Sequence, residues 1–581
     1  MDAWSAFFGP NEGYAQELYE RYLQDPASVD AETRAFFDRF SQPPPALAPS
    51  PSPTSEGRQI GATTPAEGIT DDEIRLAVGT ARLARIIRTY GHLAAHLDPL
   101  DTPPQGNRAL APAAHGLTES DLANLPASII WPGGDTHGAR NASEAIAILR
   151  AIYSGTLGYE FAHIQDEDER AWLIESVESG AFRQPLAAEE RRELLRRLTE
   201  VDTFERFLHS TFTGQKRFSI EGTDMLVPML DELIHDAAEA HTREALIGMA
   251  HRGRLNVLAH VLGKPYARIF SEFHTAPDKE MVPSEGSAGI NYGWTGDVKY
   301  HLGARKTVRE RDLAQVALTL AHNPSHLEFV NPVVQGFGRA AQEQRDERGA
   351  PQQDINKALC ITIHGDAAFP GEGVVAETLN LSRLPGYQTG GTIRIIANNQ
   401  IGFTTAADQS RSTLYASDLA KGFEIPIVHV NADDPEACLS AAALAHAYRQ
   451  RYHKDFLIDL VGYRRWGHNE GDEPTFTQPV LYARIANHPR VRELYAATLE
   501  ADGVVSSADA EAMRREVQQR LKQAYDELMA GHVPEEQAAL EESPTLASVE
   551  TAVSADALRA MNEALLARPA DFTPNTKQGK L

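Results

Sequence analysis

The stretch Cys360-Ile361-Thr362-Ile363-His364-Gly365-Asp366-Ala367-Ala368 indicates the fold class of this chain. Its apolar first half predicts a buried strand over 358–364, and Gly365-Asp366 predicts the turn that ends that strand. The stretch Ile393-Arg394-Ile395-Ile396-Ala397-Asn398-Asn399 repeats the pattern and predicts a second strand over 392–397. Apolar runs of the same kind predict three more strands, at 244–250, 426–430 and 455–461.

Helical patterns separate these strands. Helices are predicted at 255–262, from about Gly373 to Leu384, and from Pro435 to Tyr452. The last of these has Asp434 at its N-cap and a proline in its first turn, where each is favoured. Alternating strands and helices predict an α/β fold with a doubly wound parallel sheet. In such sheets ligands bind at the carboxyl ends of the strands.

The α/β pattern occupies residues 201–490, and other patterns flank it. The spacing of aromatic and leucine residues over 1–41 predicts a short helical arm, which either docks on its own protein or binds a partner. Residues 42–70, rich in Pro, Ser and Ala, predict a flexible linker. Residues 71–200 predict a helical domain, and residues 491–581 predict a polar helical connector.

Composition limits the classes of function. The chain has 581 residues, of which 42% are hydrophobic, and its formal net charge is −26. That charge argues against a general nucleic-acid binder and means that an anionic substrate would need a local cluster of basic side chains. No secretory signal or membrane-spanning stretch is visible. Cys360 and Cys438 both fall inside predicted elements, so we expect buried thiols and a cytosolic protein.

Asp366 and Asn399 each follow a predicted strand. Because the carboxyl ends of parallel strands meet at one edge of a sheet, their side chains are expected to lie together there. A carboxylate and a carboxamide oxygen, with the backbone carbonyl of Ile401, suit a magnesium ion that also holds a diphosphate. The alternative is that the asparagine only caps a turn.

Four basic or polar segments follow other strands or turns: His251-Arg252, the loop that carries His301, the turn Asn323–Glu328, and the loop that carries His468. Arg252 at a helix start suits a phosphate or carboxylate. Each segment alone fits a solvated turn or a structural histidine equally well. Together they form the local basic pocket that an anionic substrate would require.

Five stretches carry a close resemblance to a known family. They are Gly248–Leu258, Gly296–His301, Asn323–Glu328, His364–Ala368 and Asn398–Thr405. The chain resembles the 2-oxoglutarate dehydrogenases, the thiamine-diphosphate-dependent components of the 2-oxoglutarate dehydrogenase complex. The segment from Glu17 to Phe37 is similar to the family's N-terminal arm.

The resemblance implies a role for each matching position. It implies that Asp366, Asn399 and the carbonyl of Ile401 hold Mg²⁺. It implies that His251 and His301 recognise the 2-oxo acid and assist proton transfers, with His468 as a further pocket residue. It also implies a set of residues that line thiamine diphosphate: Arg252, Ser325, Leu327, Asp366, Ala367, Ala368, Asn399 and Ile401.

The resemblance further implies the thiamine-diphosphate-binding fold and the activity of the family. This activity is decarboxylation of 2-oxoglutarate with succinyl transfer to a lipoyl group of the succinyltransferase, whose core would bind the N-terminal arm. The family acts as a dimer and has a second α/β half that this sequence does not contain. The chain is therefore expected to be catalytically inactive by itself.

Two alternatives remain open at the level of sequence. The first is an enzyme that uses the same cofactor for a related reaction, either a 2-oxoadipate dehydrogenase or a carboligating 2-oxoglutarate decarboxylase. The other is a non-catalytic scaffold that binds the acyltransferase core through residues 1–41.

Overall fold

The computed structural model describes most of the chain from residue 70 onward. The described residues are 22–23, 25–29, 34, 37, 70–274, 298–309, 315–347, 349–532 and 551–573. The chain divides into two compact units, Met1–Ile69 and Thr70–Leu581. In the first unit a short 3₁₀ turn spans Pro26–Ser28, and the Tyr22 and Phe37 rings lie 5.3 Å apart. Most of the predicted arm and nearly all of the predicted linker lie outside the described residues.

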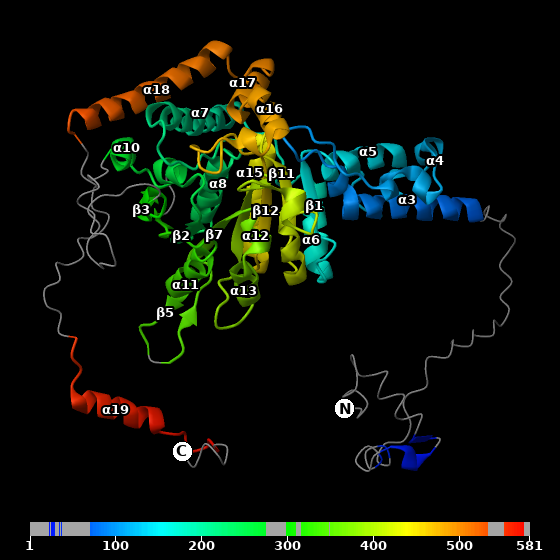
Figure 1. Cartoon of the computed structure of the whole chain (residues 1–581). Coiled ribbons are helices and arrows are strands. Elements are labelled where there is room, and N and C mark those ends of the chain that lie inside the picture. The colour runs from blue at the N-terminus through cyan, green and yellow to red at the C-terminus, as the bar shows by residue number, and fades with distance from the viewer. Residues whose placement is uncertain are drawn as a thin grey trace. The chain divides into compact units, whose positions relative to one another are not determined.

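An eight-stranded sheet forms the centre of the second unit (Figure 1). Its order is β1-β11-β12-β8-β7-β2-β4-β3. The strands are β1 (Leu157–Glu160), β2 (Glu244–Met249), β3 (Ala304–Arg309), β4 (Gln315–Leu320), β7 (Ala358–Gly365), β8 (Thr392–Asn398), β11 (Ile427–Asn431) and β12 (Phe456–Val461). Two short hairpins pair β5 (Glu343–Gln344) with β6 (Gln352–Gln353) and β9 (Ile401–Gly402) with β10 (Thr405–Ala406).

The predicted parallel sheet is confirmed in the inner strands and not at the two edges. All five predicted strands form, and the six inner strands from β11 to β4 are parallel. The two edges differ, because β1 pairs antiparallel with β11 and β3 pairs antiparallel with β4. The region 71–200, predicted to be helical, therefore also contributes an edge strand.

Helices cover both faces of the sheet. The longer helices of the second unit are α3 (Asp71–Tyr90), α5 (Ala142–Tyr153), α6 (Glu167–Glu178), α7 (Ala188–Thr211), α8 (Leu226–Glu239), α10 (Tyr266–His274), α11 (Val330–Gln342), α13 (Gly373–Leu381), α15 (Pro435–Tyr452), α16 (Pro479–Asn487), α17 (Val491–Ala501), α18 (Ser507–Met529) and α19 (Ala555–Leu566). Short ones are α4 (Glu119–Asn124), α9 (Arg254–Asn256), α12 (Ala368–Gly371), α14 (Ala407–Ser410) and the 3₁₀ segment η10 (Ala416–Phe423). Helices α3 and α5 lie beside β1 (Figure 1).

The predicted helices form with two differences. Helix α15 has the predicted bounds, and Asp434 Oδ1 accepts a hydrogen bond from the Ala437 amide at 3.1 Å, as expected of an N-cap. Helix α13 ends at Leu381, three residues earlier than predicted. The predicted helix 255–262 is a single α turn followed by a π-helical segment, Val257–Val261.

The two faces of the sheet differ in character. One face packs Ile361, Ile395 and Ile458 against α8 and α15 in the main apolar core. The other face, under α11, α13 and η10, has only small apolar clusters and carries several buried polar side chains. Both cysteines are buried free thiols, as predicted. Among the described residues, no helix has the length and apolarity needed to cross a bilayer.

Candidate functional site

The loops after β7 and β8 meet at one edge of the sheet. Gly365 pairs with Ala397 in the parallel register, so Asp366 and Asn399 leave their strands side by side. The loops also touch: a Cβ added at Gly402 would lie 2.6 Å from the Cβ of Ala367. Glycine is therefore required at 402 for this close approach. The predicted meeting of the two loops is observed.

Asp366 presents a buried carboxylate oxygen that no hydrogen bond satisfies. The residue is 3% exposed, and within the described chain its Oδ2 has no hydrogen-bond partner. Arg411 Nη1 lies 3.8 Å from Oδ2, too far for a hydrogen bond. Burial raises the pKa of Asp366 to about 6, and this outweighs the opposing attraction of Arg411. A buried carboxylate oxygen of this kind is a good ligand for a hard cation.

Asn399 lies in a loop whose backbone is held from several sides. Gln400 has a left-handed φ of 63°, and its amide donates to Asn398 Oδ1 at 3.0 Å. The Gln400 side chain donates to the Gly462 carbonyl and to Asp98, each at 2.9 Å. Asn399 Oδ1 accepts only a long 3.4 Å bond from the Ile401 amide among the contacts of the described residues. The amide oxygen thus keeps acceptor capacity for a metal.

These donors fit magnesium. One carboxylate, one amide oxygen and one backbone carbonyl would leave the remaining octahedral positions for diphosphate oxygens. In the described residues no group of three His, Cys, Asp or Glu side chains could hold a metal ion by itself. The fit therefore depends on the mixed ligand set predicted from the sequence.

His251 and His301 lie against each other beyond β2. Their Nε2 atoms are 3.3 Å apart, and their rings are nearly perpendicular at 88°. His301 Nδ1 lies 2.6 Å from the Asn323 carbonyl and must donate to it. In a neutral His301, Nε2 is then an acceptor that faces His251 Nε2. The structure thus brings together two histidines to which the resemblance gives a shared role.

Arg252 and Arg464 make the region around His468 electropositive. Arg252 donates to the carbonyls of Ser219 and His468 at 2.9 and 3.0 Å. Burial and the nearby Arg464 lower the pKa of Arg252 to about 10, while Asp366 opposes this shift. Burial, Arg252 and Arg464 lower the pKa of His468 to about 4, so this imidazole is neutral at pH 7. The charge interaction of Arg252 with Asp366 joins this region to the two loops.

Ser325 and Leu327 lie in the turn before α11. Ser325 is exposed and Leu327 is half-buried. The turn is anchored by Glu328, which has a left-handed φ of 67° and places Oε2 2.6 Å from His364 Nδ1. Ala367 and Ala368 are half-buried at the start of α12.

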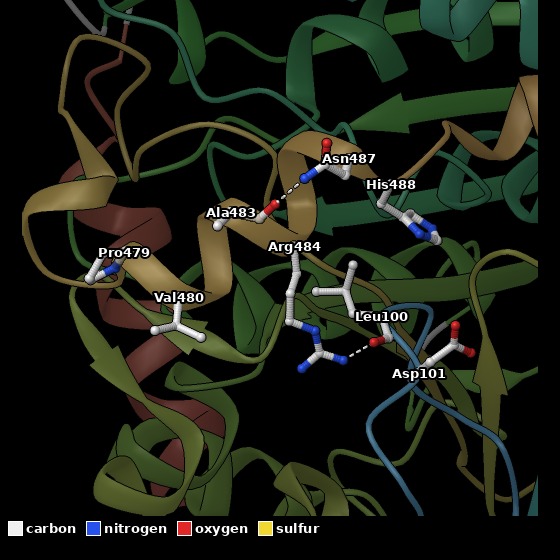
Figure 2. A pocket seen from close by; sticks show the side chains of 8 residues that line it. All are labelled: Leu100, Asp101, Pro479, Val480, Ala483, Arg484, Asn487 and His488. Carbon is white, nitrogen blue, oxygen red and sulfur yellow. Dashed lines mark hydrogen bonds between the residues drawn. The ribbon is translucent and has the colours of Figure 1, made fainter.

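Three residues near the site, Arg411, Arg464 and Gly402, have no role predicted from the sequence. Arg464 stands in a stretch that was recognised as basic, and its buried Nη1 has no hydrogen-bond partner in the described part of the chain. Arg411 approaches Asp366 from a segment that does not follow a predicted strand. An open groove of about 690 Å³ lies elsewhere, on α16 and next to Leu100, and none of the predicted site residues lines it (Figure 2).

Comparison with known proteins gives a consistent result. A family model described as "Dehydrogenase E1 component" matches residues 221–536, and one described as "2-oxoglutarate dehydrogenase N-terminus" matches residues 4–44. Proteins named 2-oxoglutarate dehydrogenase E1 component are 53% identical in Geobacillus sp. (strain WCH70) and 51% identical in Bacillus subtilis (strain 168). These alignments cover 98% of this chain and 60% and 59% of the relatives.

The chain thus spans about three fifths of the length of the curated relatives it matches. The first family model covers more than half of the chain, including every predicted site residue. The chain belongs to the dehydrogenase E1 component family.

Proposed function

We propose that this chain provides the Mg²⁺ and diphosphate site of a thiamine-diphosphate-dependent 2-oxoglutarate dehydrogenase. The reaction is oxidative decarboxylation of 2-oxoglutarate with succinyl transfer to a lipoyl group. The observation that carries this proposal is the buried, unsatisfied oxygen of Asp366 beside the Asn399 loop. The names of the relatives support the choice of substrate.

The residues fit the cofactor as follows. Asp366, Asn399 and the carbonyl of Ile401 hold Mg²⁺, while Arg252 provides positive charge for the diphosphate. Ser325, Leu327, Ala367 and Ala368 line the space beside it. When bound, thiamine diphosphate supplies the electron sink for loss of CO₂. The close approach of Gly402 to Ala367 keeps the two loops in contact.

The histidines act on the 2-oxo acid. The chain is strongly acidic, so a dianionic substrate needs the local positive potential of Arg252 and Arg464. His301 is fixed by the Asn323 carbonyl, so its Nε2 holds or releases a proton at a defined place. His251 faces that atom. His468 remains neutral in this basic region and donates or accepts a hydrogen bond without adding charge.

The partners follow from the same family membership. We place the N-terminal arm, residues 1–41, on the core of the dihydrolipoyl succinyltransferase, because residues 4–44 match the 2-oxoglutarate dehydrogenase N-terminus. The lipoyl domain of that transferase accepts the succinyl group. We further propose a homodimer that works in the bacterial cytosol.

One experiment separates this proposal from its rivals. The chain is co-expressed with the two fifths of the Bacillus subtilis relative that it does not match, and CO₂ release is measured with Mg²⁺ and thiamine diphosphate. We expect release with 2-oxoglutarate exceeding that with 2-oxoadipate, and its loss in Asp366→Ala. Preference for 2-oxoadipate, or carboligated product in place of succinyl transfer, identifies one of the related reactions. No release with any 2-oxo acid, despite a soluble assembly, contradicts the proposal.

A further inference from the structure

A row of four buried polar side chains crosses one face of the sheet from β1 to β8. Glu160, His429, Asp459 and Asn398 lie on the consecutive strands β1, β11, β12 and β8. Their exposed fractions are 7%, 0%, 0% and 3%. His429 Nε2 lies 2.9 Å from Glu160 Oε1, and His429 Nδ1 lies 2.8 Å from Asp459 Oδ2. Asn398 Nδ2 donates to Asp459 Oδ1 at 2.9 Å.

His429 is an imidazolium in this row. Both ring nitrogens face carboxylate oxygens, so both must donate. Burial alone would lower the pKa of His429, but Asp459 and Glu160 raise it to about 9. Lys421 Nζ lies 2.6 Å from both Glu160 Oε2 and Asp418 Oδ1, so this lysine joins the row to a third carboxylate. The other groups that face the ring are Tyr415, at 4.0 Å between ring centroids, and His92, at 6.3 Å.

Stability alone does not account for this row. Taking ions out of water is costly, and replacing a buried ion pair by apolar side chains is often neutral or stabilising. Apolar side chains pack on the same face of the sheet, two residues earlier on three of these strands. They are Ile396, Ile427 and Leu457, which belong to one buried cluster. A charged row in this place therefore suggests a geometric role.

The row ends at the loop of the proposed metal site. Asn398 donates to Asp459 and accepts from the amide of Gln400, so its side chain joins the row to the loop backbone. The residues on either side of that amide are Asn399 and Ile401, which present the two neutral oxygen ligands. Fixing Asp459 thus fixes the amide orientation of Asn398 and, through it, the loop.

We propose that His429 is a positioning residue that acts through Asp459 and Asn398 to hold residues 398–401 in the conformation that presents the Asn399 and Ile401 oxygens. An effect of His429 on metal binding rests on the proposed function. Its effect on the conformation of residues 398–401 does not. His429 touches neither ligand and would act over two hydrogen-bonded side chains.

Amide hydrogen exchange of the full chain tests this proposal without metal or cofactor. In His429→Gln the amide oxygen of glutamine faces one of the two carboxylates, so the row breaks. We expect the Gln400 amide to exchange about fivefold to tenfold faster, the effect of weakening one or two hydrogen bonds. His446→Gln is the matched control: His446 is also buried, on α15, but lies 3.8 Å from Asp236 and outside the row. It should leave the Gln400 amide unchanged.

Further variants separate positioning from a general loss of stability. Asn398→Ala removes only the last link and should accelerate the same amide; combined with His429→Gln it should add little. Asp459→Asn should preserve slow exchange, since its oxygen still accepts from Asn398 and its amide donates to a neutral His429. Asp459→Leu should not preserve it. If His429→Gln does not fold, these three variants still decide the question.

Unchanged Gln400 exchange in either Asn398→Ala or a folded His429→Gln overturns the proposal, as do fully additive effects in the double variant. Titration of thiamine diphosphate and Mg²⁺ into the wild-type chain is the separate measure of the proposed function. Absence of Mg²⁺-dependent binding there, with the exchange results as expected, would refute the metal site and leave the positioning role intact.

Discussion

Asp366 Oδ2 and Arg411 Nη1 face each other at 3.8 Å, and within the described chain neither buried atom makes a hydrogen bond. Opposite charges held at this distance without a hydrogen bond leave both groups poorly solvated. We infer that the Asp366 carboxylate lowers the stability of the folded chain and serves to bind a cation.

Asp366→Asn should therefore separate stability from binding. Removing a buried, unsatisfied carboxylate is expected to raise the free energy of unfolding at pH 8 by about 1–3 kcal/mol. The same change should abolish Mg²⁺-dependent binding of thiamine diphosphate, because the charged ligand is lost. Chemical denaturation and calorimetric titration measure the two effects. A destabilised variant that still binds the metal would show that Asp366 has a purely structural role.

Gly402→Ala should push the two loops apart. The new Cβ would lie 2.6 Å from the Cβ of Ala367, and overpacking of this kind costs about 1–3 kcal/mol. Adding Ala367→Gly removes the opposing atom and should restore both stability and cofactor binding. Thermal unfolding of the single and double variants is the measurement. Failure of the second substitution to compensate would mean that the loops do not meet as described.

His301 offers a test of the histidine pair. His301→Asn places an amide N–H near the position of Nδ1, so the bond to the Asn323 carbonyl and the melting temperature should be kept. The Nε2 atom is lost, and we expect CO₂ release by the co-expressed assembly to fall about 100-fold or more. His301→Gln, whose amide lies nearer the Nε2 position, should instead lose the Asn323 contact and some stability. Equal activity of both variants with the wild type would remove His301 from the reaction.

The pH dependence of stability should reveal His429. Its pKa is raised to about 9 in the folded chain, against an ordinary value of 6.5. The stabilisation is thus complete below pH 6.5 and is lost as the pH rises through about 9. The shift corresponds to on the order of 3 kcal/mol. The stability difference between wild type and His429→Gln should shrink over this interval. A difference that stays constant from pH 6 to 10 would show that His429 is not charged.

Much of this arrangement could be predicted from the sequence. The inner strands are nearly continuous apolar runs, because helices cover both faces of the sheet. Their carboxyl ends therefore locate Asp366 and Asn399 without any structure. Strands β1, β3 and β4 were missed: β1 has only four residues, β3, Ala-Arg-Lys-Thr-Val-Arg, lacks an apolar run, and β4 alternates buried residues with exposed or half-buried ones.

Contacts between distant segments could not be predicted in this way. His429 and Asp459 are visible in the sequence only as polar interruptions of apolar strands. Their pairing depends on β11 lying next to β12 in the parallel register. Arg411 likewise reaches Asp366 from a segment without a recognisable pattern. Such groups become candidates only when the sheet order is known, since neighbours in the sheet are far apart in the chain.

The position of the bound metal ion tests the proposed magnesium site. A crystal of the chain grown with thiamine diphosphate and Mn²⁺ in place of Mg²⁺ would show the ion by anomalous scattering. We predict one peak about 2.2 Å from oxygens of Asp366, Asn399 and the Ile401 carbonyl, with the diphosphate on its open side. A fully occupied ion that lies elsewhere, with these three oxygens left uncoordinated, would show that these residues do not hold the metal.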